Sequence, residues 1–205
     1  MSKITNTGVF IPEGSAAATD VAGSSQIWTK SDTPSSLYHT DDAGNDHRLG
    51  ITLGTVSTTT GGATIDFTSI PSGVKHITVL GNQISTSGTS PILFQLGDGG
   101  GFETAGYLGG EFNLATQNLT STAGFNVHSA TAAAGLYNFV VNLFLVNSAS
   151  NIWAMHGHMS RTDSVQIHSG NGSKTLSAEL TQVRVTTNGG SETFDVNGGI
   201  NIQFQ

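Results

Sequence analysis

The stretch of sequence that decides the fold is a pair of apolar segments joined by a short polar linker. The first segment is Leu136-Tyr-Asn-Phe-Val-Val-Asn-Leu-Phe-Leu-Val146, the linker is Asn147-Ser-Ala-Ser-Asn151, and the second segment is Ile152-Trp-Ala-Met-His-Gly-His-Met-Ser-Arg161. Runs of β-branched and aromatic residues bounded by small polar residues are typical of strands. The stretch therefore predicts a long antiparallel hairpin. The aromatic side chains expected to fill its core are those of Phe139, Phe144 and Trp153.

The same alternation of short strands and turns continues through residues 51–205. Turn signals such as Gly61-Gly62, Pro71-Ser-Gly73 and Asn188-Gly-Gly190 separate the apolar runs, and each favours a tight reversal of the chain. Further strands are expected at 51–57, 63–67, 74–85, 91–97, 104–108, 111–115, 123–128, 175–187, 192–196 and 200–204. Many short strands with frequent turns predict an all-β fold, here a jelly-roll-like β-sandwich.

The N-terminal quarter of the chain has a different character. Residues 1–25 are an arm with one small apolar cluster, and they offer too little apolar surface to offset the entropy lost on ordering. Residues 26–50 predict a small β-meander of three strands. Such a meander is too small to bury Trp28, Leu37 and Tyr38 within one copy. We therefore expect it to pack at the axis of a homotrimer or on a larger particle.

The composition limits the classes of function. Charged residues make up only 10% of the 205 residues, the formal net charge is −7, and the seven basic residues are scattered. Nucleic-acid binding requires clustered Lys and Arg, so it is not expected. There is no cysteine, which excludes a disulfide framework and thiol chemistry. No apolar stretch approaches the ~20 residues that cross a bilayer, so membrane insertion is not expected, and no signal peptide is evident.

Two glycine-containing segments have simple structural interpretations. Gly97-Asp-Gly-Gly-Gly101 lacks the Lys-Ser/Thr and the helix that follow the glycines of a phosphate-binding loop, so we interpret it as a turn. The acidic segment Asp41-Asp-Ala-Gly-Asn-Asp46 lacks the spacing and the flanking helices of a calcium loop. It is expected to form a solvated β-turn.

His156 and His158 form the pattern with the most chemical potential. Residues i and i+2 of a strand point to the same face, so the two imidazoles can converge. Three copies around a threefold axis would supply six nitrogens, which is an octahedral set suited to a transition metal. Two ligands from one chain make a poor site. A pair of hydrogen-bonded histidines on a polar strand face is therefore the preferred interpretation, and no cofactor is expected.

A catalytic site is not indicated by the sequence. There is no Gly-x-Ser-x-Gly nucleophile motif, and the few carboxylates show no pattern for glycoside cleavage. The protein is therefore not expected to be an enzyme. The residues most suited to a receptor site lie around the glycine-rich loop, where exposed rings and a carboxylate could stack on and hydrogen-bond a sugar. These residues are Asp98, Phe102, Tyr107 and Phe112.

Several stretches of the chain together resemble bacteriophage tail fibre and virion fibre proteins. Residues 26–49, QIWTKSDTPSSLYHTDDAGNDHRL, are similar to a short repeat of such fibres. Residues 63–79, 92–98 and 103–107 resemble a phage tail protein module, and its closing signature is similar to residues 180–195 and 199–202. The resemblance covers most of residues 26–205.

The resemblance implies a homotrimeric virion component. Its N-terminal arm would attach to other virion proteins, and its C-terminal β-sandwich would bind a bacterial surface glycan without cleaving it. The expected location is the virion, with the tail preferred to the head. Some phage fibre tips hold iron through His-x-His pairs, a pattern that His156 and His158 match only once. A purely structural head fibre, decoration or adaptor protein remains the alternative function.

Overall fold

The computed structural model describes residues 11–19, 23–31, 36–113, 118–128, 131–195 and 198–205, and it contains strands but no helix in these ranges. The chain divides into two compact units, one within residues 1–51 and one within residues 52–204. The all-β prediction is confirmed. Of the attachment arm predicted at residues 1–25, residues 1–10 and 20–22 lie outside the described residues.

The smaller unit is a mixed four-stranded sheet with the order β1-β2-β3-β4. Its strands are β1 (Glu13–Gly14), β2 (Gln26–Lys30), β3 (Ser36–Thr40) and β4 (Asp46–Arg48). β1 pairs parallel to β2, and the remaining pairs are antiparallel. The three strands expected between residues 26 and 50 are therefore present.

Trp28 anchors this small sheet. Its side chain is 8% exposed, its ring stacks on Tyr38 with centroids 5.1 Å apart, and its Nε1 donates to Thr40 Oγ1 at 2.9 Å. The expectation that one copy could not bury Trp28 is therefore wrong, because a ring stack and a hydrogen bond hold it in place. Ile27 and Leu37 remain exposed, as expected for a sheet of this size.

The segment between β3 and β4 forms the expected β-turn. Asp41 Oδ1 accepts hydrogen bonds from the backbone N–H groups of Ala43 and Asn45, and Asp41 Oδ2 lies 3.0 Å from His47 Nε2. The hydrogen bond with His47, followed by the one from Asn45, holds the pKa of Asp41 below its usual range. The carboxylate is thus engaged by its own turn, which is the arrangement of an Asx-turn.

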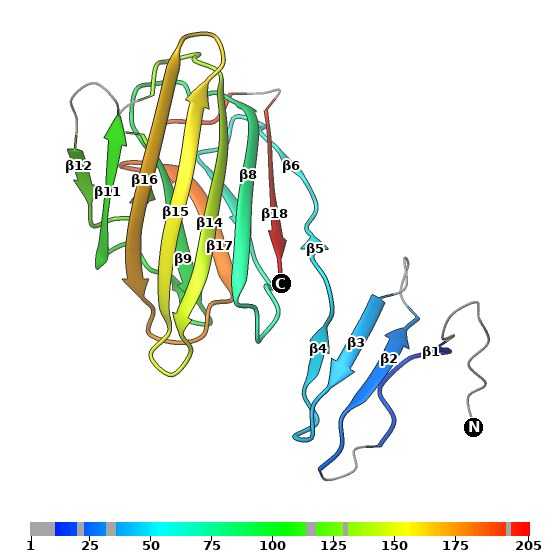
Figure 1. The fold of residues 1–205 in the computed structure, drawn as a ribbon. Coiled ribbons are helices and arrows are strands. Elements are labelled where there is room, and N and C mark those ends of the chain that lie inside the picture. The colour runs from blue at the N-terminus through cyan, green and yellow to red at the C-terminus, as the bar shows by residue number, and fades with distance from the viewer. Residues whose placement is uncertain (1–10, 20–22, 32–35, 114–117, 129–130, 196–197) are drawn as a thin grey trace. The chain divides into compact units, whose positions relative to one another are not determined.

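The larger unit contains two antiparallel sheets. The five-stranded sheet has the order β10-β9-β17-β7, with β13 also paired to β9. The nine-stranded sheet has the order β12-β11-β16-β15-β14-β8-β18-β5, with β6 also paired to β18 (Figure 1). The strand bounds are β5 (Thr52–Leu53), β6 (Ser57–Thr58), β7 (Thr64–Phe67), β8 (His76–Ile84), β9 (Ile92–Asp98), β10 (Gly101–Phe102), β11 (Tyr107–Asn113), β12 (Asn118–Ser121), β13 (Phe125–Asn126), β14 (Tyr137–Asn147), β15 (Ile152–Arg161), β16 (Gln166–Thr175), β17 (Gln182–Thr187) and β18 (Gly199–Phe204).

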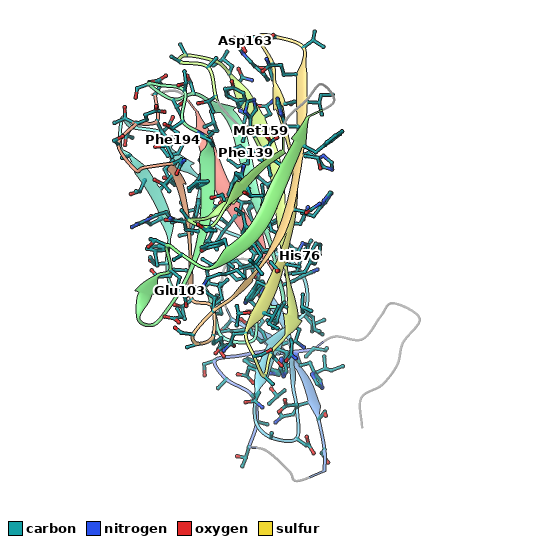
Figure 2. The ribbon with its side chains drawn as sticks, turned by 90° about the vertical axis from the view of Figure 1, so that its left-hand side faces the viewer. His76, Glu103, Phe139, Met159, Asp163 and Phe194 are labelled. Atoms are coloured by element: carbon teal, nitrogen blue, oxygen red, sulfur yellow. The ribbon has the colours of Figure 1, made fainter. Side chains whose placement is uncertain are left out.

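One core joins the two sheets. Residues from both sheets belong to a single buried apolar cluster, and Phe94 of β9 meets Phe139 of β14 edge to face with centroids 5.1 Å apart. Figure 2 shows Phe139 and Met159 in the interior. The predicted core residues Phe139 and Trp153 are buried, but Phe144 is 44% exposed. Phe144 lies in the outward phase of β14, so the prediction for this residue is wrong.

The topology contains a Greek key. β14, β15 and β16 form a meander. The earlier strand β11, which a long connection joins to β14, lies beside β16 at the end of this meander. A jelly roll distributes consecutive strands between its two sheets, whereas these three consecutive strands share one sheet. The nine-stranded sheet therefore departs from the predicted jelly-roll arrangement.

Several predicted strand boundaries are wrong. Within the described residues, β11 includes parts of both strands expected at 104–108 and 111–115, and the long strand expected at 175–187 is split between the end of β16 and β17. The described part of the strand expected at 192–196, residues 192–195, is reduced to one bridge between Phe194 and Thr86. β16 was not predicted, because its polar and glycine-rich sequence shows no apolar alternation.

Candidate functional site

The outward side of the nine-stranded sheet, which we call the outer face, carries almost no charge. It is formed by the outward residues of six adjacent strands, β11, β16, β15, β14, β8 and β18. These strands contain only three Asp, Glu, Lys or Arg residues. Glu111 and Lys174 are buried in the inward phase, and Arg161 ends β15 in an ion pair with Asp163. Apart from the ion-paired Arg161 at one strand end, the outer face therefore presents no Asp, Glu, Lys or Arg side chain.

Exposed apolar side chains are spread across this outer face. Leu108 is 72% exposed and Ile167 is 62% exposed, and both belong to the larger unit. Large apolar residues that are scattered singly over a surface need no explanation, but several on one sheet face mark an interaction surface. The exposed or half-exposed apolar residues of the outer face include Leu80, Leu108, Phe112, Val140, Phe144 and Ile167.

A hollow of about 570 Å³ lies at one end of the outer face. Its apolar lining includes Leu80, Val140 and Ile167, and its polar lining includes Asn82 and Ser160. Val140 pairs with Leu80 on β8 and with His158 on β15, so the hollow spans neighbouring strands. No Asp, Glu, Lys or Arg lines it, so the hollow suits a neutral ligand or a neutral side chain.

At the other end of the outer face, contacts between aromatic and amide groups hold the side chains in place. The ring of His76, labelled in Figure 2, stacks on Phe144 with centroids 4.5 Å apart and planes 9° apart. Asn142 Oδ1 lies 3.1 Å from His76 Nε2 and accepts a hydrogen bond from Thr78 Oγ1 at 2.9 Å. The stack holds the half-exposed ring of Phe144 in place.

His156 and His158 lie side by side on the outer face. Both are exposed, and their Nε2 atoms are 3.0 Å apart, so the predicted convergence of the two imidazoles is confirmed. Within the described residues no group of three or more His, Asp or Glu side chains is arranged to hold a metal ion. One chain thus brings two nitrogens together, and a metal at this point stays a prediction that depends on other copies.

The outer side of the five-stranded sheet is different in character. Arg184 of β17 forms a bidentate ion pair with Asp66 of β7, with N···O distances of 2.7 and 2.8 Å. Its guanidinium lies over the ring of Phe102, 4.0 Å from the ring centroid. The ion pair raises the pKa of Arg184 above its ordinary value. This side therefore carries a half-buried ring held among charged, hydrogen-bonding groups, which we call the Arg184 cluster.

The structure does not bring the four predicted receptor residues together. Phe102 lies in the Arg184 cluster, whereas Phe112 is exposed on the outer face of the other sheet. Asp98 is buried, and its carboxylate accepts hydrogen bonds from Ser177 Oγ at 2.5 Å and from Gly100 N at 2.7 Å. These bonds lower the pKa of Asp98. Asp98 therefore fixes the turn that follows β9, and its expected exposure is wrong.

Tyr107 is also buried, which contradicts its predicted place on an exposed rim. Its hydroxyl accepts a hydrogen bond from Leu96 N at 2.6 Å and donates to Glu103 O at 3.0 Å. Its ring meets Phe125 edge to face. Burial raises the pKa of the Tyr107 hydroxyl. Tyr107 therefore links β11 of the nine-stranded sheet to β9 of the five-stranded sheet across the core.

Replacing Tyr107 by phenylalanine is expected to lower the free energy of unfolding by about 1–3 kcal/mol, because the buried Leu96 N–H loses its acceptor. Cell binding per folded molecule should not change, since the ring never reaches the surface. Urea denaturation and a cell-binding assay on the same sample measure the two quantities. Loss of binding at unchanged stability would contradict this structural role.

A buried polar cluster was missed by sequence analysis. The rings of His128 and His168 lie with centroids 3.6 Å apart, and His168 Nδ1 is 3.8 Å from Glu111 Oε2. Asn126 is buried in the same segment as His128. The residues of this cluster come from β11, from β13 and the loop that follows it, and from β16. No local sequence motif therefore predicts them. We call them the histidine cluster.

The comparisons with known proteins leave the chain without relatives to argue from. No protein family matches the sequence, no curated protein matches it, and no solved structure matches the fold. In the part of the chain that the structure describes, no helix is long and apolar enough to cross a membrane.

Proposed function

We propose that this chain is a phage virion fibre protein, a tail fibre in preference to a head fibre, which attaches to a bacterial surface glycan without cleaving it. In this proposal the chain acts as a homotrimer. Its N-terminal arm contacts other virion proteins, and its two-sheet unit is the β-sandwich tip. The low charge of the whole chain and the resemblance of several stretches within residues 26–205 to fibre proteins support the proposal.

The contrast between the two outward sides of the larger unit carries this proposal. The outer face of the nine-stranded sheet is neutral and partly apolar, whereas the Arg184 cluster combines a ring with hydrogen-bonding groups. An attachment protein needs a surface for its assembly and another for its receptor. A sugar can place its C–H face on an aromatic ring while its hydroxyls bond to neighbouring charged groups, here the carboxylate of Asp66 and the guanidinium of Arg184.

Removing the ring of Phe102 is expected to weaken glycan binding about tenfold per site, because a ring contact of ~1.4 kcal/mol corresponds to a factor of ten. Avidity multiplies such an effect when three sites act together. The measurement is the binding of labelled protein to a panel of bacterial cells, before and after periodate oxidation of their surface glycans. Val165→Ala is the matched control, because Val165 is a fully exposed turn residue of the same unit.

Two results would contradict the glycan proposal. Binding that survives periodate oxidation would point to a protein receptor, and equal binding by Phe102→Ala and Val165→Ala would remove the Arg184 cluster from the receptor site. The alternative function, a purely structural head fibre, decoration or adaptor protein, predicts no cell binding at all. Immunogold labelling of particles separates the two, because it locates the protein at the tail tip or on the head.

A further inference from the structure

We infer that the outer face of the nine-stranded sheet is the surface through which copies of this chain associate. The inference rests on the proposed homotrimer and names its interface. Neither the low charge of the chain nor the small N-terminal sheet locates that interface by itself. The observations that locate it are the distribution of charge, the exposed apolar residues, the extent of the surface and the relief of the face.

The distribution of charge favours another copy of the same chain as the occupant. The chain carries a formal net charge of −7, so two copies repel each other wherever their charged surfaces meet. The outer face is free of Asp, Glu, Lys and Arg across six strands, apart from the ion-paired Arg161 at one strand end. Burying charge at a contact is costly unless it is paired, and here there is almost none to bury.

The extent of the outer face suits a stable protein–protein contact. The six strands are six to eleven residues long, about nine on average. With strands ~4.8 Å apart and ~3.3 Å per residue, they give a footprint of roughly 24 Å by 29 Å, or about 700 Å². Specific interfaces bury ~800 Å² on each partner. A single sugar would cover only a small part of this surface. The outer face therefore matches a macromolecular partner in size.

The outer face carries both an exposed aromatic ring and a hollow. The ring of Phe144, which is 44% exposed and stacked on His76, lies four residues along β14 from Val140, which lines the hollow. Four residues of strand correspond to ~13 Å. One copy can thus place its Phe144 ring in the hollow of the next, where Leu80, Val140 and Ile167 provide apolar walls. Knob and hollow on one face are what repeated contacts between identical chains require.

The test introduces charge into this face without touching the core. Val140 and Ile167 are both exposed and line the hollow, so the double variant Val140→Glu/Ile167→Glu places carboxylates at the proposed contact. Val165→Glu is the matched control, because it makes the same change at a fully exposed valine in the turn between β15 and β16. Sedimentation equilibrium gives the mass, and circular dichroism verifies the fold of each protein.

We expect the unmodified chain and Val165→Glu to sediment at three times the 21.1 kDa of one chain. We expect the double variant to sediment as a folded single chain, with association weakened at least 100-fold. A double variant that remains trimeric would overturn the assignment of this face while leaving the homotrimer intact. An unmodified chain that sediments at 21.1 kDa would overturn both, and the periodate assay would still decide glycan binding separately.

Discussion

Replacing Gly170 by alanine is expected to lower the free energy of unfolding of the larger unit by about 3 kcal/mol or more. A Cβ at this position would lie 2.3 Å from the backbone oxygen of Asn126 and 2.9 Å from Val127 Cα. Both contacts are with backbone atoms, so no side-chain rotation can relieve them. The chain around β13 would have to move away from β16, and the histidine cluster would be disrupted with it.

Gly99→Ala provides the matched control for this change. Gly99 lies in the turn after β9, where a Cβ would meet no atom within 4 Å and the backbone does not require glycine. Urea denaturation followed by the fluorescence of Trp153, in a Trp28→Phe background, reports on the larger unit alone because Trp153 is buried in its core. Equal stability of Gly170→Ala and Gly99→Ala would contradict the close approach of β13 to β16.

The larger unit is expected to lose stability as the pH falls from about 6.5 to about 4. Burial, and then the neighbouring His168, lower the pKa of His128 to about 4. A hydrogen bond between His128 and Gln166 acts in the opposite direction, and Arg161 lowers the pKa slightly further. Burial also lowers the pKa of His168, which faces Glu111. The unfolded chain therefore binds more protons than the folded chain in this range.

The sign and size of this effect follow from the two pKa values of His128. A folded-state pKa of about 4 against ~6.5 in the unfolded chain makes the loss roughly 3 kcal/mol, fully developed below pH 4 and absent above pH 7. The ion-paired or hydrogen-bonded carboxylates Asp98, Glu103 and Asp163 have lowered pKa values, so their contributions are lost only at more acidic pH. The window between pH 4 and 6.5 thus reports on buried histidines.

Comparing His128→Gln with the unmodified chain at several pH values tests this assignment. The amide cannot take up a proton in this range, so the slope of stability against pH between 4 and 6.5 should become markedly smaller. His47→Gln, a change at an exposed residue of the smaller unit, should leave the slope for the larger unit unchanged. A slope that His128→Gln does not alter would show that acid acts elsewhere in the molecule.

Most strands could be predicted because the pattern of apolar residues indicates them. The hairpin of β14 and β15 and the strands of the small sheet follow from β-branched runs between turn residues. The same alternation also indicates that Phe144 points away from the core, contrary to the prediction for this residue. Tyr137, Phe139, Val141 and Leu143 share one phase of the strand, so the even-numbered Phe144 must point the other way.

The remaining features depend on contacts between distant segments. β16 has the sequence QIHSGNGSKT, and it is a strand because β15 and β11 pair with it on both sides. Its inward glycines leave space for the segment around β13, which no local rule reveals. The same long-range contacts bury Tyr107 and Asp98 and assemble the histidine cluster. The candidate site was therefore predicted only in part, with Phe102 and Phe112 on two different sheets.

The measurement that tests association through the outer face most directly is the distance between spin labels on different copies. The chain has no cysteine, so Thr175→Cys and Thr64→Cys each provide a single labelling site. Thr175 is exposed at the end of β16 on the outer face and does not line the hollow, and Thr64 is exposed on β7, the edge strand of the five-stranded sheet. We predict strong dipolar coupling between copies labelled at position 175 and much weaker coupling at position 64. Coupling that is strong at position 64 and absent at position 175 would contradict the account.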